Sequence, residues 1–574
     1  MKNSPNNRHP YPNRKTQVIF VEGTDVQMGK QHAEQLGDSV QLGMAPFYYG
    51  FFRRILNPKE INPFEKLGYR LLGKGIDAVL AKSLVSQIPA SLCERVRGVS
   101  EASHIPEENF ITTLILPDLL PMLQAHWIKL NPRLGIPATQ PPRFGCSSFI
   151  ARGSRFLHGR NLDFPGVAYW DRYQVLQVTK PVKGLKYIGF TSAGVPLAGI
   201  SGINEAGLTV SLHQHYSVQT DWKGSLPFVI SERLLSEADT LEKAMEILKD
   251  ARLASSWAFV VADGKTQNGF IFEAHPKGAG VRWLRDEGGV LSHSNFFQSE
   301  ALKNKDYATT ERMNWDNFWR RQTLDNNIRK RLEDLSPESA VQALSDHTDG
   351  FWNEEKIVNR TVSQVYNIQS YVVDPVAMKL YLAEGNCPIH LRGYREYDLG
   401  ELFAGTYRPS ETVLSPYQFK SEENRKAKEE YILSFVAAFD EDFSQALERL
   451  KMSLDQSFTP EAALVASLVN LRIDGELDSS LEWLQSAEQA VEQKMKKYRF
   501  QNYPPEYFEV LLYQARIFDL KDQRGKAQQV YSRITKHPSL RDAGILKLAQ
   551  RAKPYTKKRV KRLIMPYSTY IPFD

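Results

Sequence analysis

A cysteine that follows a glycine opens the stretch of this sequence best suited to chemistry. Residues 145–164 read GCSSFIARGSRFLHGRNLDF, so Cys146 begins an apolar, strand-like run, and a cluster of Arg160, Asn161 and Asp163 follows after a turn. A guanidinium beside a thiol favours the thiolate and lowers the pKa of the cysteine from its free value of about 8.5. Asp163 can accept hydrogen bonds from that arginine or from an amine. These residue types suit a nucleophilic cysteine.

The turn near Gly153 returns the Arg-Asn-x-Asp cluster to the cysteine in either of two registers. A three-residue turn centred on Gly153 places Cys146 opposite Arg160. A two-residue turn at Gly153 and Ser154 places Asn161 there instead. Directly opposed residues have Cβ atoms about 4.5 to 5.5 Å apart, so both registers predict contact between the cysteine and the cluster.

The glycine before the cysteine allows a second source of activation. If the peptide bond between Gly145 and Cys146 is cleaved, Cys146 becomes a chain terminus that carries both a thiol and an α-amine. Such an amine has a pKa of about 7.7 to 8.0, so near neutral pH part of it is unprotonated and can act as the base for its own thiol. Glycine also leaves room for the thiol to reach the carbonyl behind it and permits strained backbone angles.

Three regions with different patterns must position these residues. Residues 1–145 are predicted to be mainly helical after a short strand, TQVIFVEG, and to end in the loop NPRLGIPATQPPRFG. In residues 146–400 strand signals dominate, and WAFVVADGKTQNGFIFEA and SQVYNIQSYVVDPVAMKLYLAEG each predict a hairpin. Helices interrupt the strands; the clearest is DTLEKAMEILKDA, where Asp239 and Glu242 fit a capping box. The pattern predicts an α+β fold of antiparallel sheets covered by helices.

Residues 411–574 show a helical pattern only. PEYFEVLLYQARIFDLKDQRGKAQQVYSRITKHP contains two amphipathic stretches separated by Lys521 to Gly525, and it resembles a tetratricopeptide-type helical hairpin. FSQALERLKMSL and PEAALVASLVNL form a weaker pair of the same kind. We expect a helical-repeat-like domain that packs against the catalytic body, with binding of a protein partner as the alternative.

Several motifs taken together resemble one known family. GCSSF, GRNLDF, GINEAGL, SNFF and the hairpin ending in DPVAMKLYLAEGNCP look like the isopenicillin N acyltransferase and choloylglycine hydrolase-like branch of the N-terminal nucleophile (Ntn) hydrolases. VEGTDVQMGKQHAEQLG is similar to the opening of the acyltransferase group. The likeness covers residues 17–390 in the right order and leaves out the C-terminal helices. It implies a four-layer αββα sandwich of two antiparallel sheets between helices.

The resemblance also implies autocatalytic cleavage between Gly145 and Cys146. Cys146 carries over as the nucleophile, and its freed amine carries over as the base. Arg160 and Asp163 match the family's pair beside the nucleophile, with Asp163 expected to hold the α-amine. Asn295 matches the asparagine of the family's Thr-Asn-His-Phe segment and is the expected oxyanion-hole donor.

Other residues match the family less completely. Arg312, in TTERMNW, stands where the family has a site arginine. Phe296 replaces the family's histidine, and this departure bears on substrate preference more than on the nucleophile. His213 and His215 alternate on a strand and so point to one face. Because no third ligand at suitable spacing stands out, we interpret them as lining a substrate pocket and expect no metal site.

Three further residues lie in family-like segments. Asn204 and Glu205 belong to GINEAGL, and His347 belongs to LSDHTDG. We expect structural roles for all three.

The bulk composition limits the class of protein. The chain has 574 residues, of which 42% are hydrophobic and 24% charged, as is typical of a soluble protein with more than one domain. The apolar run ITTLILPDLLPML is broken by Pro117, Asp118 and Pro121, so we expect a buried helix or two and no transmembrane segment. The first residues lack the apolar centre of a secretory signal, which favours the cytoplasm.

Cysteine usage and charge exclude further classes. Cys93, Cys146 and Cys387 are too few and too scattered for a disulfide framework or a zinc cluster. The net charge of +7 is small for this length, and the basic run from Lys553 to Arg562 is expected to be a solvated face. No phosphate-binding glycine loop and no basic-aromatic array is present in the sequence. We therefore expect neither a cofactor nor nucleic acid.

The leading hypothesis is a self-processing cysteine amidohydrolase or acyltransferase. In it Cys146 attacks a linear amide or thioester carbonyl of a small molecule, and water or an amine resolves the acyl-enzyme. One alternative is a non-cleaving scaffold that binds a partner through the C-terminal helices. The other is an unprocessed cysteine hydrolase that uses His158 or His213 as its base.

Overall fold

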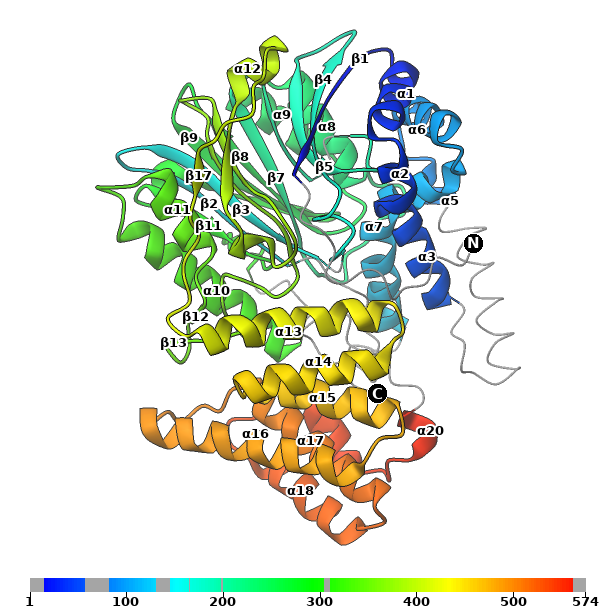
Figure 1. Cartoon of the computed structure of the whole chain (residues 1–574), viewed down its shortest axis with the longest axis vertical. Coiled ribbons are helices and arrows are strands. Elements are labelled where there is room, and N and C mark those ends of the chain that lie inside the picture. The colour runs from blue at the N-terminus through cyan, green and yellow to red at the C-terminus, as the bar shows by residue number, and fades with distance from the viewer. Residues whose placement is uncertain are drawn as a thin grey trace.

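Two β-sheets lie face to face between helices, and a bundle of helices adjoins them at the C-terminal end of the chain (Figure 1). The computed structural model describes residues 15–56, 82–130, 145–164, 166–197, 200–303 and 310–560. The loop expected before Gly145 and part of the basic run near the C-terminus lie outside these residues. The expected α+β sandwich is confirmed.

The first sheet has eight strands in the order β1-β4-β5-β6-β7-β8-β9-β10. β1 pairs with β4 in parallel, and all other neighbours in this sheet are antiparallel. The strand expected from TQVIFVEG is β1, and the first expected hairpin is β8 with β9, in which Asp263 pairs with Asn268. The strands are β1 (Gln17–Gly23), β4 (Gln174–Pro181), β5 (Tyr187–Ser192), β6 (Ser201–Asn204), β7 (Leu208–Gln214), β8 (Trp257–Asp263), β9 (Asn268–His275) and β10 (Gly278–Trp283).

The second sheet has seven strands in the order β11-β2-β3-β14-β15-β16-β17, and all its neighbours are antiparallel. β14 and β15 form the second expected hairpin. A separate pair consists of β12 (Thr348–Asp349) and β13 (Glu354–Glu355). The strands of the second sheet are β2 (Gly145–Arg152), β3 (Phe156–Asp163), β11 (Val290–His293), β14 (Asn367–Asp374), β15 (Lys379–Ala383), β16 (Tyr394–Asp398) and β17 (Val413–Leu414).

The β2–β3 hairpin has a register that neither sequence-based prediction gives. Arg152 pairs with Phe156 and Cys146 pairs with Leu162, so the turn is Gly153–Arg155. Gly153 is the first residue of this turn rather than its centre, and it lies against the backbone of a neighbouring loop. A Cβ added to Gly153 would lie 2.0 Å from the carbonyl oxygen of Leu332. The glycine therefore permits a close approach, and both predicted registers are wrong.

The helices complete four layers. The facing sides of the sheets share an apolar core that includes Ile150 of β2 with Val260 and Ile271 of β8 and β9. α8 (Pro227–Glu237) and α9 (Leu241–Asp250) pack on the first sheet, and α10 (Glu311–Arg329) and α11 (Pro337–Leu344) pack on the second. The expected helix DTLEKAMEILKDA is α9, but its N-cap is Thr240, whose hydroxyl accepts from the Lys243 amide, so the predicted Asp239 capping box is wrong.

The N-terminal helices lie beside the edge of the first sheet (Figure 1). α7 contains the apolar run with Pro117 and Pro121 inside one helix. No helix within the described ranges is long and apolar enough to cross a bilayer. These helices are α1 (Asp25–Leu36), α2 (Asp38–Leu42), α3 (Met44–Leu56), α5 (Lys82–Val85), α6 (Ala90–Ser103) and α7 (Glu107–Leu130).

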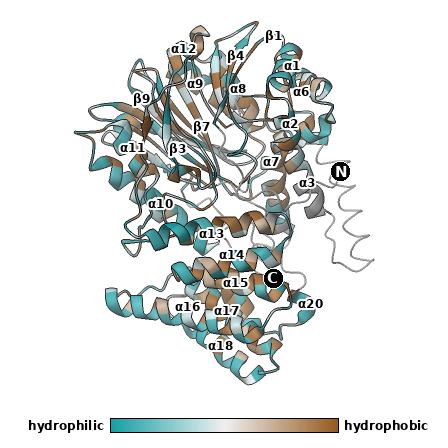
Figure 2. Ribbon diagram, viewed as in Figure 1, coloured by the Kyte–Doolittle hydropathy of each residue, from teal (hydrophilic) through white to brown (hydrophobic). Residues whose placement is uncertain are grey.

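The C-terminal helices form a stacked bundle below the sheets. In Figure 2 the strands are largely hydrophobic, whereas the outer helices α16 and α18 are mostly hydrophilic. The two amphipathic stretches near the end of the chain form the helical hairpin α17–α18, and its likeness to a tetratricopeptide repeat stays a prediction. After α12 (Leu399–Ala404) the helices are α13 (Glu422–Phe439), α14 (Phe443–Gln456), α15 (Pro460–Arg472), α16 (Leu477–Tyr498), α17 (Pro505–Leu520), α18 (Arg524–Lys536), α19 (Ala543–Arg551) and α20 (Lys557–Val560).

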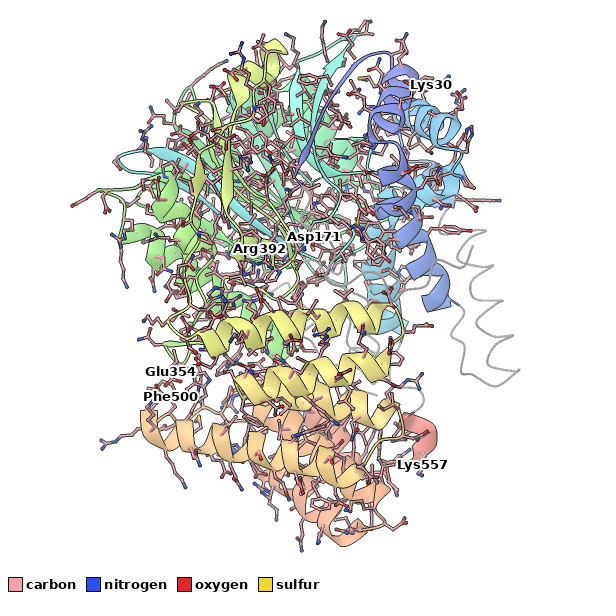
Figure 3. The ribbon with its side chains drawn as sticks, viewed as in Figure 1. Lys30, Asp171, Glu354, Arg392, Phe500 and Lys557 are labelled. Atoms are coloured by element: carbon pink, nitrogen blue, oxygen red, sulfur yellow. The ribbon has the colours of Figure 1, made fainter. Side chains whose placement is uncertain are left out.

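One edge of the junction between the sheets and the bundle is marked by Glu354 and Phe500, which lie close together (Figure 3). The Glu354 carboxylate is 2.7 Å from Lys494 Nζ and 2.8 Å from Lys497 Nζ. The Phe500 ring stacks on Trp352 with 5.7 Å between ring centroids. These contacts attach the end of α16 to the β12–β13 pair.

Candidate active site

Cys146 stands at the start of β2 with its polar groups held by three other elements. Its peptide nitrogen donates to Asn295 Oδ1 at 2.7 Å, just after β11. Its carbonyl oxygen accepts from Arg320 Nη1 of α10 at 2.6 Å. Arg160 Nη2 of β3 lies 3.4 Å from the Cys146 sulfur. The cysteine is buried, so protein atoms rather than water surround it.

The hairpin sends its functional side chains to opposite faces of the second sheet. Because Cys146 pairs with Leu162, the thiol and Arg160 share one face and Asp163 lies on the other. Arg160 crosses to the first sheet, where it donates to the carbonyl oxygens of Ile200 at 2.7 Å and Leu212 at 2.5 Å. The predicted contact of Arg160 with the cysteine therefore exists, along the diagonal of the pair rather than directly opposite.

Asp163 faces α10 and meets an arginine that the sequence analysis does not single out. Arg320 Nη1 lies 3.3 Å from Asp163 Oδ2, and Arg320 Nη2 lies 3.1 Å from Asn295 Oδ1. Asn367 of β14 donates to Asp163 Oδ1 at 2.8 Å. Burial raises the pKa of Asp163 to about 6, although Arg320 and the Asn367 hydrogen bond act in the opposite direction. Arg320 thus joins the cysteine, the asparagine and the aspartate.

Gly145 lies in a tight space and has an ordinary backbone angle. Its φ does not lie in the left-handed region. A Cβ at this position would stand 3.1 Å from Asp163 Cβ, 3.3 Å from Asp163 Oδ2 and 3.4 Å from the hydroxyl of Tyr366. The carboxylate of Asp163 therefore lies directly beside the peptide that joins Gly145 to Cys146.

The thiol of Cys146 does not have the lowered pKa that the sequence suggests. Burial raises the pKa of this thiol above its usual value. Arg160 and Arg320 act in the opposite direction but do not outweigh burial. The thiol in the continuous chain is therefore protonated near neutral pH and needs a base in order to react.

Asn295 uses both ends of its amide. Its Oδ1 accepts from the Cys146 nitrogen and its Nδ2 donates to the carbonyl oxygen of Gln214 at 3.0 Å. The Nδ2 group has two N–H donors, so one is left to bind an oxyanion while the other holds Gln214. The oxyanion-hole role stays a prediction.

Arg312 stands two turns before Arg320 on α10, and its side chain extends toward the C-terminal bundle. Its Nη1 donates to Glu509 Oε2 of α17 at 2.5 Å. The structure therefore brings Arg320, and not Arg312, to the cysteine. A signal for this was available, because Arg312, Asp316 and Arg320 recur every four residues and so share one face of the helix.

A cluster of histidines lies between the sheets near the cysteine. His213 Nε2 lies 2.5 Å from Ser148 Oγ, and His215 Nε2 lies 2.9 Å from His293 Nε2. The ring centroids of His213 and His293 are 5.0 Å apart. Burial lowers the pKa of all three histidines, to about 3 in the case of His215. His293 was missed by the sequence analysis.

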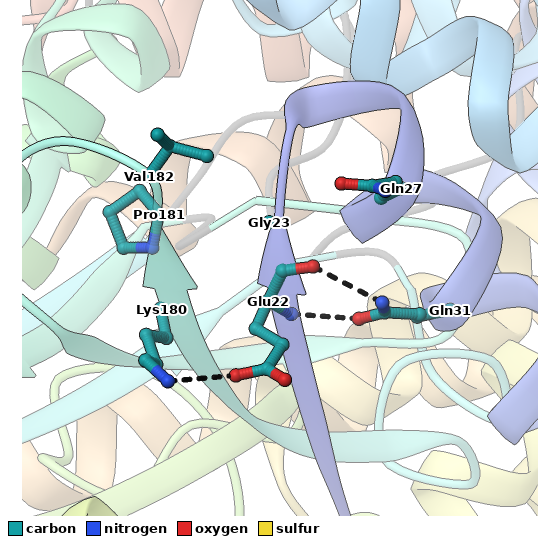
Figure 4. Close-up of a pocket in the computed structure, with 7 residues that line it drawn as sticks. All are labelled: Glu22, Gly23, Gln27, Gln31, Lys180, Pro181 and Val182. Carbon is teal, nitrogen blue, oxygen red and sulfur yellow. Dashed lines mark hydrogen bonds and ion pairs between the residues drawn. The ribbon is translucent and has the colours of Figure 1, made fainter.

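The described residues around these histidines form no metal site. Within the described part of the chain, no group of three or more His, Cys, Asp or Glu side chains could hold a metal ion. Phe296, the residue expected at the pocket, is half-buried. Figure 4 shows a surface pocket elsewhere, at the end of β1, where Lys180 pairs with Glu22 at 3.0 Å. Its lining consists of Glu22, Gly23, Gln27, Gln31, Lys180, Pro181 and Val182.

His158, one of the two alternative bases, is held by hydroxyl groups of the first sheet. His158 lies 2.7 Å from Thr209 Oγ1 through Nδ1 and 3.1 Å from Ser211 Oγ through Nε2. Burial lowers the pKa of His158 to about 3. Both ring nitrogens contact hydroxyl groups of the first sheet, and the ring meets Tyr371 of β14 edge-on with 6.3 Å between centroids.

Asn204 and Glu205 hold a turn of the first sheet. Asn204 donates to the carbonyl oxygens of Leu235 and Ala238 at 3.1 and 2.7 Å. Glu205 accepts from the Lys186 amide at 2.9 Å. These contacts are consistent with the structural roles expected for the pair.

His347 contacts the first helix of the C-terminal bundle and the segment that precedes it. Its Nδ1 is 3.3 Å from Lys428 Nζ of α13, and its ring stacks on Phe419 with centroids 3.7 Å apart.

Comparison with known proteins gives one family. Residues 151–387 match the model of the acyl-coenzyme A:6-aminopenicillanic acid acyl-transferase family. This is the acyltransferase branch that the sequence motifs resemble. The match begins just after Cys146 and ends before the C-terminal helices.

Two individual proteins are similar to the chain. An uncharacterized protein of Archaeoglobus fulgidus is 20% identical over 391 residues, which cover 61% of this chain and 62% of the relative. The chain thus spans less than two thirds of the length of that curated relative. A solved structure, the Caenorhabditis elegans ortholog of N-acylethanolamine-hydrolyzing acid amidase, aligns with 19% identity and a TM-score of 0.30 over 40% of this chain and 93% of that protein.

Proposed function

Because residues 151–387 match the model of the acyl-coenzyme A:6-aminopenicillanic acid acyl-transferase family, we propose that the chain is a self-processing cysteine amidohydrolase or acyltransferase of the Ntn-hydrolase kind. Cys146 is the nucleophile, and the bond before it is the first one broken. Residues 1–145 become the small chain, residues 146–400 the catalytic core and residues 411–574 an attached helical domain. The substrate is a small molecule with a linear amide or thioester bond.

The observation that carries this proposal is the arrangement around the peptide between Gly145 and Cys146. The nitrogen of this peptide is bound by Asn295 Oδ1 at 2.7 Å, and the carboxylate of Asp163 lies beside its glycine. When the bond breaks, that nitrogen becomes an α-amine already placed between an amide oxygen and a carboxylate, both of which accept hydrogen bonds from it.

Self-cleavage proceeds by transfer of an acyl group from nitrogen to sulfur. The Cys146 sulfur attacks the Gly145 carbonyl carbon, a thioester forms, the peptide C–N bond breaks, and the thiol proton passes to the departing nitrogen. Water then hydrolyses the thioester and releases the Gly145 carboxylate. Arg160, 3.4 Å from the sulfur, stabilises negative charge as it develops there.

The mature reaction uses the same sulfur, with the freed α-amine of Cys146 as its base. The new α-amine has an ordinary pKa of about 7.7 to 8.0, so part of it is neutral at pH 7 and can take the thiol proton. This base compensates for the raised pKa of the buried thiol. Attack on the substrate carbonyl releases an amine or a thiol, and water or an amine acceptor takes the acyl group from Cys146.

Intact mass measurement of the purified chain tests the proposal. The wild type should give two fragments that divide between Gly145 and Cys146. Cys146→Ala should give a single chain, and Cys93→Ala, which removes a thiol elsewhere, should be cleaved normally. An active but uncut wild type overturns the proposal.

The same measurement separates the two alternatives. Loss of activity in His213→Ala, with an uncut and active wild type, supports the unprocessed hydrolase. An uncut and inactive wild type supports the scaffold. A library of N-acyl amides and thioesters, with released acyl groups detected by mass, then identifies the substrate class.

A further inference from the structure

The C-terminal bundle meets the catalytic region through buried charges as well as apolar side chains. Glu461 of α15 and Glu506 and Glu509 of α17 are at most 2% exposed. An isolated buried carboxylate is strongly unfavourable, so each requires a cation at close range. The three cations that pair with them lie in the catalytic region; they are Arg312, Lys356 and Arg360.

The pairs are well defined. Glu506 binds Arg360 with both oxygens, at 2.7 Å from Nη2 and 2.8 Å from Nη1. Arg360 Nη2 also lies 2.9 Å from Asp349 Oδ2. Lys356 bridges Asp349 and Glu461. The bidentate geometry fixes the Arg360 guanidinium in orientation as well as position.

Arg360 continues this network toward the cysteine. Its backbone nitrogen donates to Asp316 Oδ1 at 2.7 Å. Asp316 Oδ2 lies 3.3 Å from Arg320 Nε, one turn along α10. Arg320 then contacts the Cys146 carbonyl oxygen and the Asp163 carboxylate. Glu506 is therefore linked to Cys146 by hydrogen bonds, ion pairs and the covalent side chain of Arg360. Asp316 Oδ1 also accepts from Gln364 Nε2 at 3.1 Å.

Glu506 and Arg360 stay ionised in this network. Burial raises the pKa of Glu506, but Arg360 and Lys356 hold it well below its usual range. Burial lowers the pKa of Arg360, but Asp349 and Glu506 hold it above its usual range. Both groups stay ionised at all ordinary pH values, so the contact between them is not lost by titration.

We propose that Glu506 of the C-terminal bundle is a positioning residue for the cysteine centre, acting through Arg360 and Asp316 on Arg320. The bundle is then an internal support of the site. This proposal rests on the proposed function. If Glu506 is neutralised, Arg360 loses one of the three carboxylates that surround it and shifts toward Asp349 and Glu461. This shift displaces the Arg360 backbone, and the positions of Asp316 and Arg320 change with it.

The pH profile of self-cleavage reports whether Arg320 has moved, because protonation of Asp163 is expected to produce its acidic limb. Arg320 and Arg160 lower the pKa of Asp163, whereas Asp316 raises it, and Lys428 of α13 also acts on it electrostatically. Weaker contact with Arg320 raises the pKa of Asp163, so the acidic limb of the profile moves to higher pH. A change confined to the stability of the bundle leaves that limb in place.

The experiment uses the full chain with Glu506→Gln and three companions. Glu506→Asp keeps the charge on a shorter side chain, and Glu482→Gln removes an exposed carboxylate from α16. Leu484→Ala removes a fully buried side chain of α16 and destabilises the bundle without touching the network. Intact mass against time gives the cleavage rate from pH 4 to 9, and thermal unfolding gives Tm.

Glu506→Gln should cleave about tenfold more slowly than the wild type. Its acidic limb should lie about one pH unit higher. Glu506→Asp should recover part of both effects, and Leu484→Ala should lower Tm and keep the wild-type limb. A Glu506→Gln profile that coincides with that of Glu482→Gln overturns the proposal.

A second measurement keeps this test separate from the proposed function. Hydrogen exchange of α10 and β2 peptides is compared between Cys146→Ala and Cys146→Ala with Glu506→Gln. Faster exchange in both elements supports the positioning role even if the wild type is never cut, and unchanged exchange overturns it.

Discussion

Two buried clusters of this protein each enclose a cation, Arg320 in one and Lys428 in the other, and the groups around the cation differ. At the cysteine centre, Arg320 contacts Cys146 and is 3.3 Å from both Asp163 and Asp316. At the second cluster, Lys428 of α13 donates to Ser363 Oγ at 2.7 Å and Ser363 also contacts His390. Both clusters are fully enclosed by protein.

The difference lies in the counter-charge. Arg320 has carboxylate partners, whereas no carboxylate within the described ranges forms an ion pair with Lys428. Burial consequently lowers the pKa of Lys428 to about 7. A buried cation keeps its proton where carboxylates surround it, and loses the proton near neutral pH where only hydroxyl, carbonyl and imidazole groups do.

The largest effect is expected from Arg320→Met, which removes the cation from the paired cluster. Asp163 and Asp316 are then buried without this partner, and breaking such a pair typically costs about 3 to 5 kcal/mol of stability. Self-cleavage should slow by about 100-fold, because the peptide before Cys146 is no longer held in place. Denaturant unfolding and intact mass measure the two quantities.

Arg321→Met is the matched control for this change. Arg321 is the next residue of α10, and its guanidinium contacts Gln322. If Arg321→Met loses as much stability and cleavage rate as Arg320→Met, then pairing with carboxylates does not explain the effect of Arg320.

An intermediate effect is expected from the pH dependence of Asp163. Because the pKa of Asp163 is about 6, the cleavage rate of the wild type should fall below about pH 6 as the carboxylate that holds the new amine is protonated. Asp163→Asn should cleave slowly at every pH and show no limb near 6. An unchanged limb in Asp163→Asn would assign it to another group.

The stability of the fold should respond to Asp163 in the opposite direction. Its folded pKa is raised, so its contribution to stability is fully present below about pH 4 and is lost as pH rises through about 6. The pH dependence of unfolding free energy in Asp163→Asn should lack this component.

The last effect is expected from Lys428→Met, and it appears as a dependence of stability on pH. The folded pKa of Lys428 is lowered to about 7 from 10.5, so its cost to stability is complete below pH 7 and is relieved as pH rises toward 10.5. Wild-type stability should therefore gain about 1 kcal/mol per pH unit over this interval relative to Lys428→Met. Unfolding free energies between pH 6 and 10 measure the difference, and equal slopes would show that Lys428 stays charged.

The sequence predicts well those features that depend on neighbouring residues. The β2–β3 hairpin, the β8–β9 and β14–β15 hairpins and the α9 helix follow from alternation and turn signals. The contact of Arg160 with Cys146 also follows, because both lie on one hairpin. Even here the predicted register is wrong. Gly153 begins the turn and lies against the backbone of Leu332, which is distant in the sequence.

The sequence does not predict features that depend on packing between distant elements. Arg312 and Arg320 share a helix face, and only the position of α10 against β2 and α17 decides which of them reaches the cysteine. The raised pKa of the Cys146 thiol depends on total burial, which no local pattern reports. Lys428 lies outside every motif of the family resemblance.

The network that joins α17 to Cys146 also bears on the order of folding. The Asn295–Cys146 contact spans 149 residues, the Arg320–Cys146 contact spans 174 and the Arg360–Glu506 contact spans 146. Each closes a long loop before it yields any stabilisation, and contacts of such high contact order form slowly. The hairpin of Cys146 can form early by itself, but its surroundings are complete only once α17 has emerged from the ribosome and docked.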